Sequence, residues 1–250
     1  MKLAIISDIH GNFHALKKAL EIIDKKKISE VICLGDLVDY GANPNECILH
    51  VEAKCRISLL GNHDEAALDI SQAEDHFTEL ALASTKWTIK TLADSCRKYL
   101  TRRPLKHEEF DVMFVHSSPK EPFAWHYILS EIDAKENFRM FSTPICFFGH
   151  SHRAEIFCNT YEHIEPKSTQ SYNDGSSELY LLDKTKRYLI NPGSVGQPRD
   201  YNPRLSFGIF DTEEFTYENI RADYDIHSAS QAILAAKLPQ YNAQRLFLGK

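Results

Sequence analysis

Residues 146–155 read CFFGHSHRAE, so an apolar run ends at a glycine and two histidines follow, one residue apart. The chain contains 12 histidines among 250 residues, and about 0.6 such pairs are expected by chance at that frequency. The pair alone therefore indicates nothing, and the rest of the chain must decide whether it belongs to a site.

Four further apolar runs end in residues that can bind a metal. They are IISDIH (5–10), ICLGD (32–36), SLLGNHD (58–64) and MFVH (113–116). Short aliphatic runs of this kind predict buried strands, and ligands bind at the carboxyl ends of strands in an open parallel α/β sheet. We therefore expect one edge of the sheet to gather eight side chains: Asp8, His10, Asp36, Asn62, His63, His116, His150 and His152.

The N-terminal part of the chain alternates strand and helix patterns. Strands are predicted at 2–6, 31–34 and 56–60, and apolar residues at 13, 16, 20 and 23 have helical spacing. A short helix is expected near 45–53. This alternation predicts a parallel sheet with helical crossovers. Residues 65–103 have helical periodicity without a strand signal, so two or three helices are expected there, near the metal edge.

The rest of the chain is predicted to be richer in strands. We expect a strand at 111–115, a helix at 129–141, several strands from Ala154 onward, a polar loop or hairpin tip at 165–178 and a final helix at 228–238. Glycines directly precede Asp36, Asn62 and His150, and we expect them to let the backbone turn sharply off the strands.

The eight residues suit a site with two metal ions. Imidazoles, carboxylates and one amide oxygen fit divalent first-row metals such as manganese, iron or zinc better than calcium. Two such ions about 3.5–4 Å apart need a bridging anionic ligand, and Asp36 at the middle strand end is the candidate. The sequence also contains a control, because DIH recurs at 225–227 without a following glycine and at the start of a helical pattern. We assign that second copy no function.

Composition excludes several classes of protein. The formal net charge of −6 argues against nucleic acid as a routine partner. The six cysteines show no C-x-x-C spacing, and Cys33 and Cys146 lie in apolar runs, which predicts buried, reduced thiols and a reducing compartment. No apolar run approaches the roughly 20 residues of a membrane span, and the N-terminal apolar run is too short for a signal peptide. The expectation is a cytoplasmic protein.

Five motifs in order resemble those of the calcineurin-like metallophosphoesterase superfamily: DIHGN (8–12), GDLVDYG (35–41), GNHD (61–64), VH (115–116) and GHSH (149–152). NPGSVGQPR (191–199) extends the match. The chain is most similar to the bacterial and archaeal phosphodiesterases and diadenosine tetraphosphatase-like proteins. The resemblance implies a four-layer α-β-β-α sandwich of two mixed sheets flanked by helices. It also implies one domain over 1–250, with a helical, cap-like insert at 65–103.

The resemblance also implies a role for each site residue. One ion would be held by Asp8, His10 and His152, the other by Asn62, His116 and His150, and Asp36 would bridge them. The ions would be divalent, with manganese first and iron, zinc, nickel, cobalt or magnesium as alternatives. A hydroxide bridging the ions would attack the phosphorus of a small, nucleotide-like substrate, His63 would protonate the leaving group, and Asp64 would orient His63.

The sequence departs from parts of the family in its phosphate-binding residues. Tyr40 stands where protein phosphatases and symmetrical diadenosine tetraphosphatases usually carry an arginine, and LGNHD replaces RGNHE. Both changes remove a bidentate phosphate ligand, so phosphoprotein substrates are disfavoured. Tyr40 and Arg199 are candidates for substrate binding, although Tyr40 could simply be packed and Arg199 could pair with Asp200. Phe77 and Trp87 in the helical insert are either core residues or part of a cap.

Three functions remain open at this stage. We favour a phosphoesterase for phosphodiester or nucleotide-type substrates. The alternative is a diadenosine tetraphosphate hydrolase, which applies the same chemistry to an anhydride. A non-catalytic scaffold, such as the retromer subunit of similar fold, is the third. It predicts loss of ligands and above all of the histidine in GNHD, whereas His63 and all seven ligand positions are present.

Overall fold

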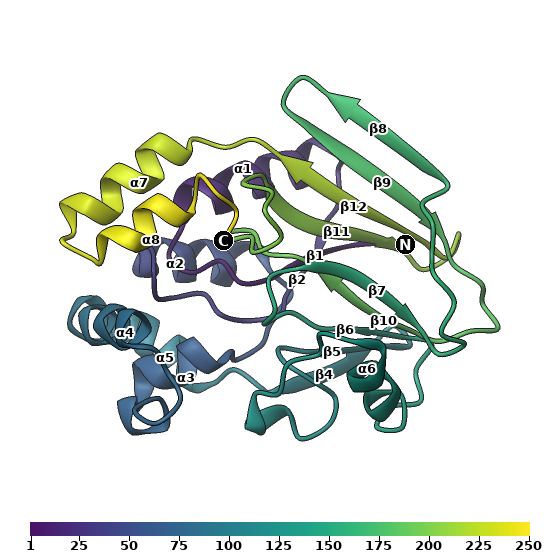
Figure 1. Ribbon diagram of the computed structural model, residues 1–250, viewed down its shortest axis with the longest axis horizontal. Coiled ribbons are helices and arrows are strands. Elements are labelled where there is room, and N and C mark those ends of the chain that lie inside the picture. Colours follow the sequence, from purple (N-terminus) through teal and green to yellow (C-terminus); the bar gives the residue numbers. More distant parts are fainter.

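The computed structural model describes the backbone of residues 1–250 and every side chain except that of Gln72. The described backbone forms two mixed β-sheets, one of seven strands and one of five (Figure 1). The larger sheet has the order β3 (Ile57–Ser58), β2 (Glu30–Cys33), β1 (Lys2–Ile6), β11 (Leu205–Asp211), β12 (Thr216–Ala222), β9 (Gly175–Leu181) and β8 (Ser168–Tyr172). The smaller sheet has the order β4 (Lys106–Glu109), β5 (Val112–Val115), β6 (Ile145–Phe147), β10 (Tyr188–Pro192) and β7 (Ala154–Cys158).

Each sheet has a parallel part at which the candidate site residues begin. In the larger sheet β1 pairs in parallel with β2, and β2 with β3. In the smaller sheet β6 pairs in parallel with both β5 and β10. The expectation of a single sheet edge is therefore wrong, because the five strand ends come from two sheets. Apolar runs predict a strand but do not say which strands pair, and this is why the sequence pattern could not separate the sheets.

Alternation along β1 shows how the two sheets pack. Leu3 and Ile5 lie in the core between the sheets, where Phe114 and Phe147 of the smaller sheet meet them. The intervening Ala4 and Ile6 face the helices that cover the other side of the larger sheet. Both faces of the strand are thus buried, which explains its continuous apolar sequence.

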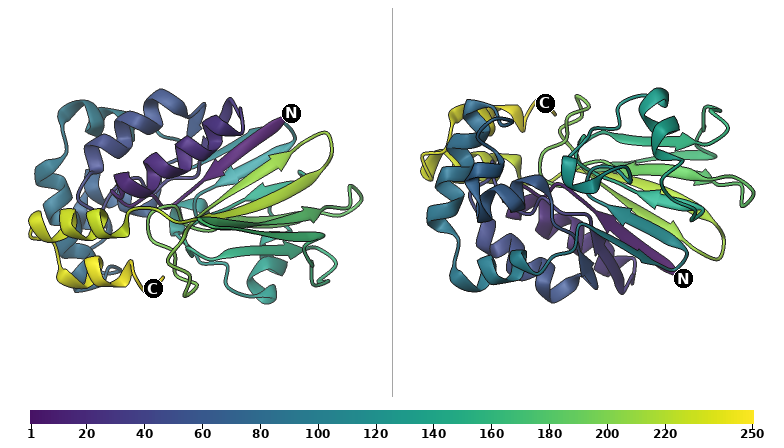
Figure 2. Two further views of the ribbon diagram at one scale, coloured as in Figure 1. Left: turned by 90° about the horizontal axis from the view of Figure 1, so that it is seen from above. Right: turned by 90° about the horizontal axis from the view of Figure 1, so that it is seen from below.

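The helices form the two outer layers. Helices α1 (Phe13–Lys25), α2 (Pro44–Lys54) and α5 (Asp94–Thr101) contribute to the core on the larger sheet, and α6 (Glu131–Asn137) packs on the smaller one. The result is the expected four-layer α-β-β-α sandwich. The remaining helical elements are α3 (Asn62–Leu68), η1 (Ile70–Gln72), α4 (Glu79–Thr91), η2 (Pro122–Ala124), α7 (Ile226–Ala235) and α8 (Gln240–Arg245). Figure 2 shows the blue and yellow helices α3–α5, α7 and α8 gathered at one end of the two sheets.

Most of the predicted elements are present, and those that were missed are short or polar. Residues 165–178 include β8 and the start of β9, so the hairpin alternative is correct. Strand β4 and the helical elements η2 and α8 were not predicted, and β8 was anticipated only as part of the possible hairpin. The six cysteines are unpaired in the described structure, and Cys33 and Cys146 are buried. No described helix has both the length and the apolar character that a membrane crossing requires.

Candidate metal centre

The candidate ligands lie in loops that directly follow the parallel strands. Asp8 and His10 follow β1, Asp36 follows β2, and His116 follows β5. His150 and His152 lie between β6 and β7, and Asn62 is the first residue of α3. The structure brings these side chains into two buried groups whose ligand atoms lie within 4.8 Å of one another: Asp8, His10, Asp36 and His152 in one, Asp36, His116 and His150 in the other.

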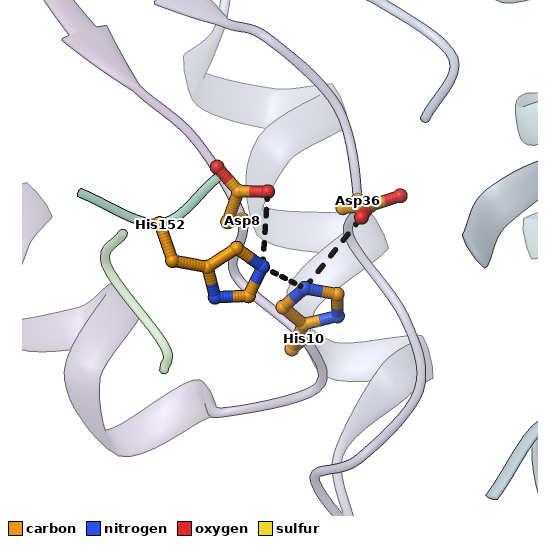
Figure 3. Close-up of side chains that lie close together, drawn as sticks. All are labelled: Asp8, His10, Asp36 and His152. Carbon is orange, nitrogen blue, oxygen red and sulfur yellow. Dashed lines mark hydrogen bonds and ion pairs between the residues drawn. The ribbon is translucent and has the colours of Figure 1, made fainter. Parts of the chain in front are cut away.

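Figure 3 shows the first group, in which two imidazoles converge between two carboxylates. Nε2 of His152 lies 3.4 Å from Oδ1 of Asp8 and 3.1 Å from Nε2 of His10. The same His10 nitrogen lies 3.5 Å from Oδ2 of Asp36. All four residues are almost completely buried. The carboxylates and imidazole nitrogens thus surround a common point.

The second group is built around the same oxygen of Asp36. Nε2 of His116 lies 3.3 Å from Oδ2 of Asp36 and 3.3 Å from Oδ1 of Asn62. The rings of His116 and His150 have their centroids 5.2 Å apart. Asp36 is therefore common to both groups.

Backbone carbonyls fix which nitrogen of each imidazole is free. Nδ1 donates to a carbonyl oxygen in His10 (Val38, 2.9 Å), His116 (Leu34, 3.1 Å) and His152 (Gln197, 2.6 Å). In His150 it is Nε2 that donates, to Trp125 at 3.0 Å. Since a carbonyl can only accept, the other ring nitrogen of each histidine carries a lone pair for a metal whenever the ring is neutral.

The unpaired atoms of the centre fit divalent cations. The Nε2 atoms of His10 and His152 face each other at 3.1 Å although both carry lone pairs, and Oδ2 of Asp36 is buried without a hydrogen-bond donor. Buried polar atoms without partners are costly. A cation at each group would supply the missing partner, and mixed imidazole, carboxylate and amide donors suit first-row divalent metals.

Burial and charge keep the imidazoles largely neutral. Burial lowers the pKa of His10, His150 and His152 well below the ordinary value. For His116 burial acts in the same direction, but the negative charge of Asp36, 3.3 Å away, outweighs it and raises the pKa of His116 to about 9. Burial raises the pKa of Asp8 to about 6. Three of the four histidines are thus ready to bind a metal at neutral pH.

The backbone of the centre is held in a conformation that residues other than glycine rarely adopt. Five of the seven candidate ligands have a left-handed φ: Asp8 (52°), His10 (49°), Asp36 (53°), His150 (65°) and His152 (60°). Each such residue costs about 1–3 kcal/mol and tends to occur at functional sites. The strained backbone at these five residues directs their side chains into the two buried groups.

The three glycines that precede ligands act in different ways. Gly35 has a φ of 109°, so its role is the expected sharp turn. Gly61 has an ordinary φ of −99°, and Gly149 is not among the residues with positive φ. At both positions a Cβ would collide with a neighbouring group, with Asp36 at Gly61 and with Ser7 and Asp8 at Gly149. These two glycines allow neighbouring loops to approach closely. The expectation that they make sharp turns was therefore wrong for Gly61 and Gly149.

His63 is oriented by Asp39 and not by Asp64. Nδ1 of His63 lies 2.8 Å from Oδ2 of Asp39. The Asp64 carboxylate instead accepts backbone N–H groups, from Leu37 at 2.8 Å and from Gly61 at 3.1 Å. The predicted role of Asp64 is therefore wrong, because the first turn of α3 points this side chain at the loop after β2. Asp64 ties the GNHD and GDLVD loops together.

Residues 191–199 join the loops that carry the ligands. The hydroxyl of Ser194 donates to the backbone oxygen of Asp8 at 2.8 Å. The amide of Asn191 donates to the backbone oxygen of Gly149 at 2.8 Å and to Ser151 at 3.0 Å. With the Gln197 carbonyl on His152, this segment ties both sheets together at the centre.

Two aromatic residues near the centre carried no signal in the sequence. Trp125 accepts from His150 through its carbonyl, and its indole N–H donates to Glu65 of α3 at 2.9 Å. The ring of Tyr127 stacks on His150 with centroids 4.0 Å apart and an interplanar angle of 16°. Both lie in an irregular loop, so only the fold could reveal that they adjoin the metal ligands.

Other residues singled out in the sequence divide between the centre and the core. The Tyr40 ring is buried, 4.9 Å from His10 and 4.8 Å from His63, so it lies at the centre. Phe77 contacts the His63 ring at 4.4 Å, whereas Trp87 packs against the core of α7 and α8. Asp225 of the second DIH caps α7 by accepting from the Ser228 N–H.

Arg199 does not pair with Asp200, since Asp200 bonds to Arg221. The guanidinium of Arg199 instead donates to the side-chain oxygen of Gln197 at 2.8 Å. A separate cavity of about 480 Å³ lies between β7 and β9, with Glu155, Tyr180 and Arg221 in its wall. It contains none of the candidate ligands, and the convergent lone pairs therefore place the centre in the loops after the strands.

Known proteins resemble this chain over its full length. It is 38% identical over 253 residues to an uncharacterised protein of Methanocaldococcus jannaschii, covering 99% of this chain and 98% of that one. It is 35% identical to the crystal structure of a metallophosphoesterase from Sphaerobacter thermophilus, with a TM-score of 0.85, covering 100% of this chain and 99% of that one. A symmetrical bis(5′-nucleosyl)-tetraphosphatase of Psychromonas ingrahamii is 32% identical over 126 residues, which are 47% of this chain and 44% of that protein.

The family comparison agrees with the geometry of the centre. The sequence profile of the calcineurin-like phosphoesterase superfamily domain matches residues 1–214. This range includes every candidate ligand, from Asp8 to His152. The two sheets and the buried Asp/His groups are those that the motifs imply. This chain belongs to the calcineurin-like phosphoesterase superfamily.

Proposed function

We propose that the protein is a dinuclear, metal-dependent phosphoesterase that hydrolyses phosphodiester or nucleotide-type substrates. The observation that carries this proposal is the pair of buried ligand groups that share Asp36. Asp8, His10 and His152 would hold one ion, Asn62, His116 and His150 the other, and manganese is the first candidate for both. When bound, two such ions polarise the phosphoryl group and activate water as a nucleophile.

His63 is positioned to act as the general acid. Its Nδ1 donates to Asp39, which leaves Nε2 as the atom that can transfer a proton. A carboxylate at that distance stabilises the positive charge of the protonated ring and fixes its direction. The backbone N–H of His63 donates to Asp36 at 2.9 Å, so the acid is tied to the bridging ligand. Proton transfer to the leaving oxygen contributes typically 10²–10⁴-fold.

Residues 65–103 support a cap-like role beside the acid. Phe77 covers one face of the His63 ring, and the Thr85 hydroxyl donates to Asp39 at 2.5 Å. Phe77 is half-buried, so part of its ring remains available to a substrate. We propose that this segment excludes water around His63 and takes part in substrate selection.

Hydrolysis of dinucleoside tetraphosphates is the second candidate. It is favoured by the similarity to the symmetrical tetraphosphatase over residues that make up 47% of this chain. The chemistry at phosphorus would be the same, and the leaving group would be a phosphate oxygen. A non-catalytic scaffold has no need for buried, unpaired lone pairs at Asp36, His10 and His152, and these therefore favour an enzyme.

Hydrolysis of bis-p-nitrophenyl phosphate tests the proposal. The protein is stripped of metal, reconstituted with Mn²⁺ and compared with the His63→Ala variant. We expect turnover that needs Mn²⁺. On a dinucleotide, whose leaving alkoxide must be protonated, turnover should fall about 10²–10⁴-fold in the variant, and on bis-p-nitrophenyl phosphate, whose p-nitrophenolate leaves without a proton, it should fall much less. The matched control is His227→Ala, which removes the exposed histidine of the second DIH and should retain full activity. Equal turnover of the dinucleotide in His63→Ala would exclude His63 as the acid, and a fully loaded protein inactive on diesters and dinucleotides would favour a scaffold.

A further inference from the structure

We infer that Arg199 and Arg245 form a subsite beside the metal centre for a second phosphate of the substrate. This inference rests on the proposed phosphoesterase function and narrows its substrate class. The substrate would carry another phosphate next to the one that is cleaved, as a nucleoside diphosphate or a longer polyphosphate does.

The two guanidinium groups converge on one aromatic ring at the edge of the centre. The central carbon of Arg199 lies 5.8 Å from the centroid of the Tyr40 ring, and that of Arg245 lies 5.7 Å from it. The same ring is 4.9 Å from His10 and 4.8 Å from His63. The backbone N–H of Arg199 also donates to the backbone oxygen of His152. Both arginines are therefore separated from the candidate ligand His10 and from His63 by the Tyr40 ring alone.

Neither guanidinium has a carboxylate side chain as a partner within the described structure. Arg199 donates to the neutral side chain of Gln197, and Nε of Arg245 donates to the main-chain oxygen of Lys250. Burial lowers the pKa of Arg245 to about 10, and the charge of Arg199 acts in the same direction. Two half-buried cations that repel each other are unfavourable unless an anion joins them.

A phosphate is the anion that fits this pair. Guanidinium groups bind phosphate oxygens through two parallel N–H donors, which an isolated charge does not offer. Within the described residues, Arg199 is hydrogen-bonded to the uncharged side chains of Gln197 and Tyr127, and Arg245 bonds through Nε to the Lys250 main-chain oxygen. Both arginines lie over the ring of Tyr40, which adjoins His10 and His63, so a phosphate between them would lie beside the phosphate at the metal centre.

Helix α8 brings the second arginine to this place. It lies beyond residue 214, where the family match ends. Asn242 of the same helix is buried, and neither atom of its amide has a hydrogen-bond partner. It lines a cavity of about 10 Å³ together with His10, Tyr40 and Gln197, which is about the room that one water needs. Helix α8 therefore presents polar groups, and not only its apolar core, to the centre.

Binding of ADP and AMP to the Mn²⁺-loaded protein tests the inference by calorimetry. Because the adenosine is common to both ligands, the ratio of their dissociation constants reports on the second phosphate. We expect ADP to bind at least tenfold more tightly than AMP. In Arg199→Gln and in Arg245→Gln the ratio should fall to about threefold or less, and Arg245→Lys should retain part of the preference. Arg204→Gln is the matched control, since Arg204 pairs with Asp223, and it should leave the ratio unchanged.

The outcomes separate this inference from the proposed function. A ratio near one in the unmodified protein would overturn the subsite, whatever the variants do. If the same preparation still hydrolyses bis-p-nitrophenyl phosphate, the phosphoesterase proposal stands without the subsite. A tenfold ratio that needs both arginines, in a preparation without hydrolysis, would support the subsite and contradict the proposed function.

Discussion

Three of the contacts that His63 makes have separate consequences. Asp39 fixes Nδ1, Phe77 covers a ring face, and the backbone N–H is bonded to Asp36. Among the described residues none is hydrogen-bonded to Nε2, so Nε2 is the nitrogen through which His63 would transfer a proton. Positioning at this level is what general acid catalysis requires.

Substitutions of Asp39 and Asp64, the two aspartates near His63, should have different effects on kcat and on the free energy of unfolding. Asp39→Asn removes the charge that supports the protonated His63, and we expect kcat to fall about tenfold or more while the melting temperature changes little. Asp64→Asn weakens a carboxylate that accepts backbone N–H groups in two loops, and we expect a loss of about 1–3 kcal/mol of unfolding free energy. Steady-state kinetics and thermal unfolding of both variants check this. A larger kcat loss in Asp64→Asn would restore it as the orienting residue.

Metal affinity should depend on pH through His116 and Asp8. The protonated form of His116, with a pKa of about 9, competes with the metal, so affinity should fall as pH falls below 9. One proton is displaced per site, and the apparent dissociation constant should rise about tenfold per pH unit. Below pH 6 the protonation of Asp8 should steepen the dependence. Calorimetry with Mn²⁺ between pH 5.5 and 8.5 measures this, and a flat profile between pH 7 and 8.5 would contradict it.

The sequence predicted which residues at the end of each strand belong to the site, but not how their side chains pair with one another. Asp8, Asp36 and His116 each directly follow an apolar run, and the structure brings them together. Asp39 was missed because its partner His63 lies 24 residues away, and side-chain pairing depends on the path of both loops. Asp64 is adjacent to His63 in the sequence, but the helical turn directs it elsewhere.

Helix α4 contacts the loop that carries Asp39, the hydrogen-bond partner of the proposed acid His63. Thr85 donates to Asp39, and Ser84 accepts from the Tyr40 N–H, so the helix is docked on the loop after β2. Both side chains are completely buried. Helix α4 therefore holds Asp39 in place beside His63. We expect substitutions in this helix to change kcat.

Two threonines of α4 allow a matched comparison. Thr85→Val removes the donor to Asp39 and keeps the shape of the side chain, and we expect kcat to fall by less than in Asp39→Asn, with a loss of about 1–3 kcal/mol of stability. Thr91→Val removes a hydroxyl that bonds only within the helix, to Trp87, and should leave kcat unchanged. Kinetics and thermal unfolding of the two variants are the measurement. Equal kcat values in both would show that α4 does not support the acid.

The elements that the sequence did not reveal share a physical cause. β4 reads KHEE and β8 reads STQSY, and both are edge strands with exposed side chains. Without a buried face a strand has no apolar alternation to detect. Helix α8 has six residues, which is too short for a helical period to stand out. Long amphipathic elements such as α1 were found because they bury a full apolar face.

At the scale of the whole molecule, the centre depends on the packing of two sheets. Asp8, His10, Asp36 and Asn62 follow strands of the larger sheet, whereas His116, His150 and His152 follow strands of the smaller one. The sequence pattern could show that the strand ends converge, but not that they come from two sheets, because strand pairing is set by contacts far apart in the chain. A metal at this place would join the two halves of the sandwich.

The metal content of the reconstituted protein tests the central claim most directly. After incubation with Mn²⁺ and gel filtration, elemental analysis should find two ions per chain. Asp36→Asn, which removes the shared carboxylate, should hold one ion or none, and His227→Ala should still hold two. Two ions in the unmodified protein that are lost with Asp36 would support a shared dinuclear centre. A single ion, or none, in the folded unmodified protein would contradict it.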